Sequence, residues 1–535
     1  MLPRDAHAKL EAIQAKDEIT TADVAVLERL FGLSFQESER KSIAANLMGL
    51  RKGYETIRKL PIDNAVAPPL PFVVYGKQPA AGKSVKVSTK SLRPALATDE
   101  DIAFASIVDL GDLIRRKKIS SVELTHLYLK RLKAHGTELL NVINLTEETA
   151  LRQAKAADDD LARGYNRGAL HGIPYGIKDL FAAKGYPTTW GAEPYEKQML
   201  DYDATVVRKL EAAGAVLCAK LSCGALAMDD HWFKGKTKNP WNTAQGSSGS
   251  SAGSASATAA GLVGFTIGTE TLGSIMSPSH RCRVYGLRPT FGRVSRAGAM
   301  ALSWTMDKVG PIARGAQDCA LILPAIMGHD AGDVASVDRP FSFRPDLDLS
   351  KLKIGYIEND AALDEDDSGS GASSHLKLLR SLGADPKPIK ITPPGDGIDM
   401  VLSVEAAAAF DELTRTGAVN SISASLWADI FRTHRFVPGV EFLQAMRARF
   451  LLMQQFEKEL GDFDAIIASD RGSFLLFITN LTGHPQMYVP MGTNAKGVPR
   501  GLSIVGRLYD EGTILGMAAR IQSATSYWKL RPQFS

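Results

Sequence analysis

The sequence predicts an α/β fold built around one large β-sheet that is covered by helices. From about residue 101 onward, short apolar runs alternate with stretches of helical periodicity, a pattern typical of strands joined by helices. At 535 residues with 44% hydrophobic residues, the chain can bury a large core, and it shows no internal repeat. The predicted strands are Ile173–Ile177, Ala215–Ala219, Val263–Ile267, Lys353–Ile357, Asp464–Ala468, Met487–Pro490 and Leu502–Val505.

Composition divides the chain into three parts. Residues 1–60 have helical spacing and predict an N-terminal helical appendage. Residues 61–104, rich in Pro, Lys and Gly, predict an extended linker. Residues 105–535 carry the alternating pattern and form the main domain.

Two helix starts are visible as capping-box patterns. Ser34 with Glu37 predicts the start of a helix in the appendage, and Ser120 with Glu123 predicts another in the main domain.

Charge and hydropathy exclude several classes of partner. The net charge of +4 is small, and the Lys and Arg residues form no basic stripe interleaved with aromatics, so we expect no nucleic-acid partner. No apolar run reaches about 18 residues, so we expect no membrane-spanning segment.

Cysteine and histidine usage indicates compartment and cofactors. The four cysteines form no CxxC pair, which fits either a reducing compartment or simple buried thiols. The ten histidines show no metal-ligand spacing, so we expect no metal or cofactor. The N-terminal residues are charged rather than apolar. We therefore expect a cytoplasmic location, unless an export signal has been removed.

The segment from Gln245 to Ser274 is the most informative part of the chain. A Gly/Ser loop leads into a run of small helical residues, a turn at Gly261, an apolar strand and a second glycine-containing loop. A helix of about nine residues advances about 14 Å, and a return strand of about five residues covers about 17 Å. The two nearly cancel, so Ser250 and Ser274 can lie side by side.

Other motifs in the chain compete with this interpretation. The loop lacks the GxxxxGK[ST] pattern of a phosphate-binding loop. Residues 249–253 match GxSxG with Ser251 as the nucleophile, but the preceding residues are polar and turn-rich, where that motif needs a strand. The SxxK matches at Ser350 and Ser526 lack companion motifs.

These segments resemble the amidase signature family. GSSAGSASATAAGLV followed by GTETLGSI is similar to that family's Gly/Ser loop, its Ala-Ala-Gly-Leu-Val and its Gly-Thr-Asp-Thr-Gly-Gly-Ser-Ile. LHGIPYGIKDL, Asn-Pro-Trp at 239–241, and further motifs at 282–296, 306–314 and 479–485 follow in the family's order. The resemblance covers about residues 105–535 and implies an amidase catalytic domain with a large mixed sheet covered by helices on both faces.

The register of the resemblance selects Ser250 over Ser247. Counting from Asn-Pro-Trp and back from Ala-Ala-Gly-Leu-Val places the family's relay serine at Ser250, although GSSG at 246–249 imitates the same loop. The resemblance also implies a cis peptide bond between Gly249 and Ser250.

The resemblance implies a serine hydrolase that cleaves an amide carbon–nitrogen bond. Ser274 would be the nucleophile, Ser250 the proton relay and a neutral Lys178 the base, because Lys178 follows an apolar run that would lower its pKa by burial. Taken alone, Lys178 would more simply be a surface lysine paired with Asp179.

The oxyanion hole would consist of backbone N–H groups. It would use those of Thr271, Leu272, Gly273 and Ser274.

This chain departs from the family at Glu270, Leu272 and Met276, where Asp, Gly and Arg are usual. The missing Arg weakens the inference of a charged, glutamine-like substrate.

Four further residues are candidates for substrate binding. Met228, Asp229 and Asp230 align with a family segment that lines the acyl pocket, and Trp190 is either core filling or a pocket wall.

Three functions remain open. The first is a stand-alone amidase of neutral or aryl amides, with esters or carbamates as related substrates. The second is a glutamine-hydrolysing subunit of a tRNA-dependent amidotransferase, and the third is a non-catalytic binding homologue. The partner expected here is a small-molecule amide; the sequence does not decide between a single chain and a homodimer.

Overall fold

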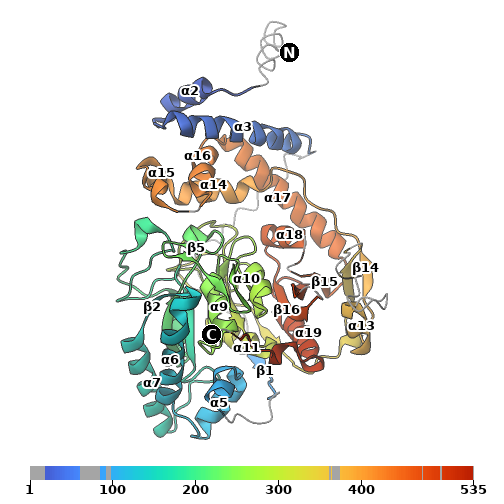
Figure 1. Cartoon of the computed structure of the whole chain (residues 1–535). Helices are drawn as coiled ribbons and strands as arrows, with labels where there is room; N and C mark the ends of the chain where they lie inside the picture. The colour runs from blue at the N-terminus through green and yellow to red at the C-terminus, as the bar shows by residue number, and fades with distance from the viewer. Residues whose placement is uncertain are drawn as a thin grey trace. The chain divides into compact units, whose positions relative to one another are not determined.

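The computed structural model describes residues 18–60, 85–91, 98–358, 360, 363, 374–423, 425–470, 472, 474–494 and 497–533 (Figure 1). The expected linker at 61–104 lies largely outside these residues. The chain divides into two compact units. The first comprises 1–70, 394–421 and 426–452, and the second comprises 71–393, 422–425 and 453–535.

The first unit is helical in its described residues. Its helices are α2 (Thr21–Phe31), α3 (Glu37–Arg58), α14 (Met400–Ala409), α15 (Asp411–Arg415), α16 (Trp427–His434) and the first part of α17 (Gly439–Leu460). A capping box starts α3, but it joins Gln36 to Glu39 rather than Ser34 to Glu37, because the chain becomes helical only after Gln36. A small core that includes Val24 and Phe436 joins α2 and α3 to the segment after α16.

The second unit contains a sheet of eleven strands among the described residues (Figure 1). In spatial order they are β14 (Lys387–Ile389), β13 (Ile354–Ile357), β15 (Ala465–Ser469), β17 (Pro499–Gly506), β16 (Gln486–Thr493), β10 (Tyr285–Arg288), β11 (Lys308–Ala313), β9 (Phe265–Glu270), β3 (Pro174–Lys178), β4 (Val216–Leu221) and β2 (Val142–Leu145). β9, β3 and β4 run parallel, as do β14, β13 and β15, while the other neighbours are antiparallel. The predicted α/β fold with a mixed sheet is confirmed, and every predicted strand overlaps an observed one, with ends that differ by up to three residues.

Minor strands form separate two-stranded sheets. They are β1 (Val85–Val87) with β12 (Phe341–Phe343), β5 (His231–Trp232) with β6 (Gly235–Lys236), and β7 (Lys238–Asn239) with β8 (Asn242–Gly246).

Helices pack on both faces of the large sheet. Successive side chains of a strand point to opposite faces. In β16, Met487 and Val489 belong to the main core with α11 and α19, whereas Tyr488 lies in a second core with α9 and α10. The helices of this unit are α4 (Asp99–Ala103), α5 (Ile107–Arg115), α6 (Ser121–Leu139), α7 (Glu147–Ala162), α8 (Thr205–Ala212), α9 (Ala252–Ala259), α10 (Met276–Cys282), α11 (Ala316–Ile326), α13 (Ser374–Ser381), α18 (Leu475–Thr482) and α19 (Glu511–Ala524). The capping box of Ser120 and Glu123 at the start of α6 is confirmed.

Short 3-10 helices complete the described structure. They are η1 (Glu193–Tyr195), η2 (Ala225–Ala227), η3 (Leu349–Lys351), η4 (Ala418–Ser421) and η5 (Tyr527–Lys529). No helix in the described ranges is long and apolar enough to cross a membrane.

Helix α9 lies close against strand β9, as the out-and-back geometry of the sequence predicted. The N–H of Ser251 donates to the carbonyl of Ser274 at 3.0 Å, which joins the start of the helix to the loop after the strand. Gly268 of β9 makes this approach possible, because an added Cβ would lie 2.6 Å from Oγ of Ser251. The two predicted serines are thereby carried on adjoining segments.

We predict that Gly268→Ala destabilises the catalytic unit by about 1–3 kcal/mol, since the new methyl group must push α9 away from the sheet. Chemical denaturation of purified protein measures the free energy of unfolding. Gly49→Ala in α3 is the control, because its added methyl group meets nothing within 4 Å. Equal stability of Gly268→Ala and the native chain would contradict the close packing.

Candidate functional site

Lys178 is the last residue of β3 and its side chain is fully buried. Its Nζ donates to Oγ of Ser250 at 2.8 Å and to Oγ1 of Thr269 at 2.8 Å. Among the described residues, no carboxylate lies within ion-pair distance of this amine. The simpler alternative, a surface lysine paired with Asp179, is therefore wrong.

Asp179 pairs instead with Lys220 of β4. Nζ of Lys220 lies 2.8 Å from Oδ1 of Asp179, and both side chains are fully buried. The N–H and the hydroxyl of Thr189 also donate to this carboxylate. The Asp179 carboxylate is thus held by Lys220 and Thr189.

The surroundings of Lys178 favour its uncharged form. Burial lowers the pKa of Lys178 to about 8, although the Cys223 thiol and the more distant Asp307 and Glu270 act in the opposite direction. The hydroxyl groups of Ser250 and Thr269 bind the amine without adding a negative charge. Lys178 can therefore exchange a proton near neutral pH.

Ser250 lies in the loop before α9, and its side chain is buried. The Gly249–Ser250 peptide bond is cis, as the resemblance implied. Gly249 is required because an added Cβ would meet the carbonyl oxygen of Asp229 at 1.7 Å. Ser247, the alternative in the sequence, directs its hydroxyl to the carbonyl of Ser248 at 3.0 Å. The serine that contacts Lys178 is therefore Ser250.

Ser251, the candidate of the GxSxG motif, is held by the strand beside it. Its hydroxyl donates to the carbonyl of Thr269 at 3.0 Å and accepts from the Thr269 N–H at 3.2 Å. Both hydrogen-bonding functions of Ser251 are used in packing α9 against β9. The strand before this loop, β8, belongs to a small separate sheet.

The SxxK matches do not bring serine and lysine together in a buried site. The hydroxyl of Ser350 donates to Asp348, and Lys353 pairs with Asp462 on the surface. Ser526 and Lys529 are both exposed.

Thr269 is the functional candidate that the sequence analysis missed. Its side chain contacts Lys178, while its backbone binds Ser251. The only signal in the sequence was its place in the GTETLGS segment, where a threonine within a strand is unremarkable.

The loop from Thr271 to Ser274 follows β9 directly. Among the described residues, none accepts a hydrogen bond from the backbone N–H groups of these four residues. Ser274 itself is only 7% exposed, and the next-but-one residue, Met276, begins α10. The loop therefore presents free donors beside the serine hydroxyl.

Glu270 fixes the shape of this loop. Its Oε2 accepts from the N–H groups of Ile275 at 2.8 Å and Met276 at 2.9 Å. Its Oε1 accepts from Nη1 of Arg288 at 2.7 Å and Nδ2 of Asn480 at 2.9 Å. Burial raises the pKa of Glu270, but Arg288 and these hydrogen bonds outweigh it, so the net pKa is below its ordinary value. The carboxylate is thus a charged clamp across the loop.

Asp307 holds the other end of the same loop. Its Oδ1 accepts from the hydroxyl of Thr271 at 2.6 Å, and its Oδ2 accepts from the N–H groups of Leu302 at 2.8 Å and Ser303 at 3.0 Å. Burial raises the pKa of Asp307, while these three donors lower it less strongly.

Met228, Asp229 and Asp230 lie behind the Ser250 loop. Asp230 is buried, and its Oδ2 accepts from the N–H of Ser248 at 2.8 Å, which shapes the turn before Ser250. Met228 is partly buried and Asp229 is exposed. The structure therefore gives Asp230 a role in holding the loop.

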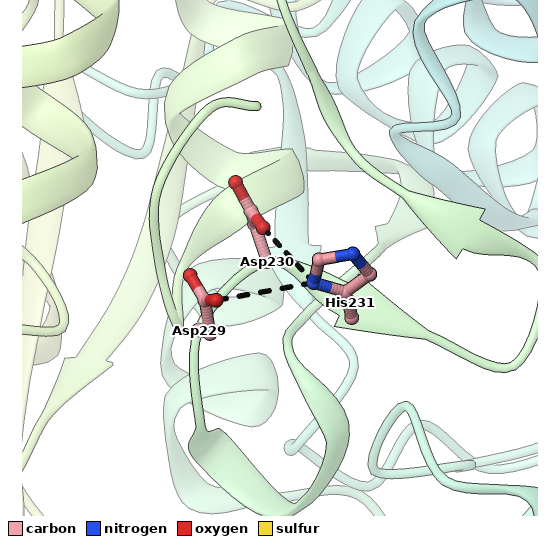
Figure 2. A group of neighbouring side chains, drawn as sticks. All are labelled: Asp229, Asp230 and His231. Carbon is pink, nitrogen blue, oxygen red and sulfur yellow. Dashed lines mark ion pairs between the residues drawn. The ribbon is translucent and has the colours of Figure 1, made fainter. Parts of the chain in front are cut away.

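Asp229, Asp230 and His231 also form the candidate metal group (Figure 2). Figure 2 shows Nδ1 of His231 facing both carboxylates, at 3.8 Å from Asp229 and 3.5 Å from Asp230. Lys236 already places an ammonium group 3.9 Å from Oδ1 of Asp230. Burial and the neighbouring Asp229 raise the pKa of Asp230. The carboxylate of Asp230 thus faces both the His231 imidazole and the Lys236 ammonium group.

Trp190 lies beside the segments that follow β3 and β4. Its N–H donates to the carbonyl of Asp179 at 3.2 Å, and its carbonyl accepts from the N–H of Leu226 at 2.9 Å. Its partly buried ring lies 4.5 Å from that of Tyr195.

This arrangement can transfer protons and stabilise an oxyanion. A buried amine contacts one serine, a second serine lies on the adjoining segment, and free N–H donors precede it. Such an arrangement suits nucleophilic acyl transfer.

Known proteins resemble this chain in sequence. A family model described as Amidase matches residues 123–468. A glutamyl-tRNA(Gln) amidotransferase subunit of Geobacter metallireducens is 34% identical over 480 residues, covering 79% of this chain and 97% of the relative. The protein of the same name from Thioalkalivibrio sulfidiphilus is 32% identical, covering 80% of this chain and 99% of the relative.

Solved structures of amidases are similar to this chain in fold. The peptide amidase of Stenotrophomonas maltophilia is 27% identical with a TM-score of 0.69, covering 80% of this chain and 98% of that protein. An amidase family protein from Bacillus anthracis is 25% identical with a TM-score of 0.73, covering 82% and 94%. On these grounds the chain belongs to the amidase signature family of hydrolases, which act on carbon–nitrogen bonds.

Proposed function

We propose that this protein is a stand-alone amidase that cleaves small neutral or aryl amides through an acyl-enzyme on Ser274. The observation that carries the proposal is the 2.8 Å contact between Nζ of Lys178 and Oγ of Ser250 in a fully buried setting. Among the described residues this amine has no carboxylate partner. Bound to a serine whose segment adjoins that of a second serine, it is suited to pass protons rather than to hold charge.

The chemistry follows from this contact. The neutral amine of Lys178 accepts the proton of Ser250, which accepts that of Ser274, so that Oγ of Ser274 attacks the carbonyl carbon. The proton returns along the same path to the leaving nitrogen as the carbon–nitrogen bond breaks, because amines leave poorly when unprotonated. Water then attacks the ester, with the relay acting again as the base.

The N–H groups of residues 271–274 would bind the oxygen that becomes negative in the transition state. One such donor contributes about 3–4 kcal/mol in enzymes that use an oxyanion hole. Because Glu270 and Asp307 hold the loop from its two ends, the donors are oriented before substrate binds.

The residue at position 276 supports a neutral substrate. Met276, where the family usually has Arg, is buried in an apolar core and offers no cation to a charged substrate.

The cysteines bear on the compartment. The four cysteines are all buried and unpaired, which supports the proposal of a reducing, cytoplasmic compartment.

We predict that a fluorophosphonate probe labels Ser274, as read by mass spectrometry of peptides. Ser274→Ala should abolish labelling, and Ser250→Ala and Lys178→Ala should slow it by about 10²- to 10⁴-fold, since each removes a step of proton transfer. Ser247→Ala is the matched control for Ser250→Ala and should label at a rate close to that of the native chain.

Other labelling results would change the assignment. Labelling at Ser251 would favour the GxSxG interpretation. Folded protein that takes up no probe and cleaves neither anilides nor primary amides would support a non-catalytic homologue.

We predict that kcat/KM rises with pH and levels off above about pH 8. Only the unprotonated amine of Lys178 can accept a proton, and with a pKa of about 8 roughly one-tenth of it is unprotonated at pH 7. Thr269→Val removes a hydrogen bond to the ammonium form, so the midpoint of the profile should move to lower pH. A profile that is flat from pH 6 to 9, in the native chain, would contradict Lys178 as the base.

A glutaminase subunit of a tRNA-dependent amidotransferase is the second candidate, because the relatives described above bear the name of such an enzyme. We expect the purified chain alone to hydrolyse neutral aryl amides at least tenfold faster than glutamine, since the buried Met276 offers no charge to the substrate. Comparing kcat/KM for benzamide and for glutamine measures this. A preference for glutamine would favour the amidotransferase role.

A further inference from the structure

Two exposed apolar side chains lie on loops that meet at the candidate active site. Leu272, within the predicted oxyanion loop, is 37% exposed, and Trp304 is 49% exposed. Single exposed apolar side chains are common on protein surfaces, so their exposure alone carries no argument. Trp304 is of interest because Asp307 ties its segment to Thr271, in the loop that leads to Ser274.

Asp307 ties the two loops together. It binds the hydroxyl of Thr271 on one side and the N–H groups of Leu302 and Ser303 on the other. The segment that carries Trp304 is thereby fixed against the segment that carries Leu272. Because neither Trp304 nor Leu272 takes part in these hydrogen bonds, replacing either side chain would leave the contacts between the two loops in place.

A cavity of about 220 Å³ opens on this segment, and we call it the Trp304 cavity. Its lining includes Trp304, Met300 and the small side chains of Ala297, Ala299 and Ala301. A second, much smaller hollow shares Ala299, Met300 and Asp307 with it and reaches Thr269 and Thr271. The Trp304 cavity therefore adjoins the residues that contact Lys178 and start the oxyanion loop.

Of the three charged residues in its wall, Arg296 and Asp333 pair with each other, and Asp307 is held by one hydroxyl and two backbone N–H groups. Arg296 binds Asp333 through two side-chain hydrogen bonds, Nε to Oδ2 at 2.8 Å and Nη2 to Oδ1 at 2.7 Å. Its Nη1 donates to the carbonyl of Trp304 at 2.5 Å. An ionised ligand would have to disrupt this pair, whereas an uncharged apolar ligand would not.

We propose that the Trp304 cavity binds an uncharged aromatic or alkyl group of the amide substrate, with Trp304 as a specificity-determining residue. The inference rests on the proposed function and adds the substrate class to it. Size agrees with this assignment, because apolar cavities of about 150 Å³ already take up benzene.

The test uses three fluorophosphonate probes and the labelling rate of Ser274 by mass spectrometry. One probe carries only methyl and ethoxy groups, a second carries phenylpropyl on the phosphorus atom, and a third carries phenylpropyl on the ester oxygen. We expect one phenylpropyl probe to label native protein at least tenfold faster than the small probe. The preferred probe identifies whether the acyl or the leaving side occupies the cavity.

Two variants of the wall and a matched control complete the experiment. Trp304→Ala removes the aromatic wall, and Ala301→Leu narrows the cavity, so each should reduce the preference to within about twofold while leaving the small-probe rate nearly unchanged. Tyr165→Ala, at an aromatic residue 59% exposed elsewhere in the unit, should leave the preference intact.

The outcomes separate this inference from the function on which it rests. Equal rates for all probes in native protein, a preference that survives Trp304→Ala, or a loss that is equal for small and large probes would each overturn the cavity assignment. Ser274 would still be labelled in those cases. Native protein in which no probe labels Ser274 would overturn the proposed function and the cavity assignment together.

Discussion

The candidate site depends on burying Lys178 without giving it a carboxylate. Two lysines are buried on neighbouring strands, and they have different partners. Lys220 has Asp179 at 2.8 Å, whereas Lys178, within the part of the chain that the structure describes, has only hydroxyl and carbonyl oxygens. A buried ammonium group is costly unless an opposite charge lies beside it. Turning Asp179 toward Lys220 therefore makes one lysine structural and leaves the other with a pKa of about 8.

The carboxylates near the site, Glu270 and Asp307, bind backbone N–H groups rather than Lys178. One carboxylate oxygen of Glu270 pairs with Arg288, and the other accepts hydrogen bonds from the two N–H groups that follow Ser274. Asp307 is bound to a hydroxyl and two N–H groups rather than to a lysine. Both carboxylates thus shape the oxyanion loop from its two ends. The loop can then leave its own N–H groups unpaired, because its conformation is fixed from outside.

Sequence patterns predicted the elements that are apolar and regular. Strands β3, β4 and β9 are buried along their whole length and begin with mostly apolar residues, as expected for strands covered on both faces. In the large sheet, the prediction missed β2, β10, β11 and β14. In β11 the reason is specific: Pro311 lies inside a central strand, where proline usually argues against pairing. The helix-capping pattern at Ser120 was predicted correctly, but the one at Ser34 was misplaced by two residues because Gln36 and Glu39 offer the same chemistry.

At the site, local patterns predicted the segments but not the contacts across the sheet. The return of a strand after a helix places Ser250 and Ser274 on adjoining segments, and this follows from rise per residue alone. Which residue receives the second hydrogen bond of Lys178 depends on the register of β3 against β9, and no pattern within either strand fixes that register for Thr269. Asp307 is harder still to foresee, because it acts through Thr271, far away in sequence. A mechanism can thus be inferred from local motifs, whereas substrate selectivity depends on loops that meet only in the folded chain.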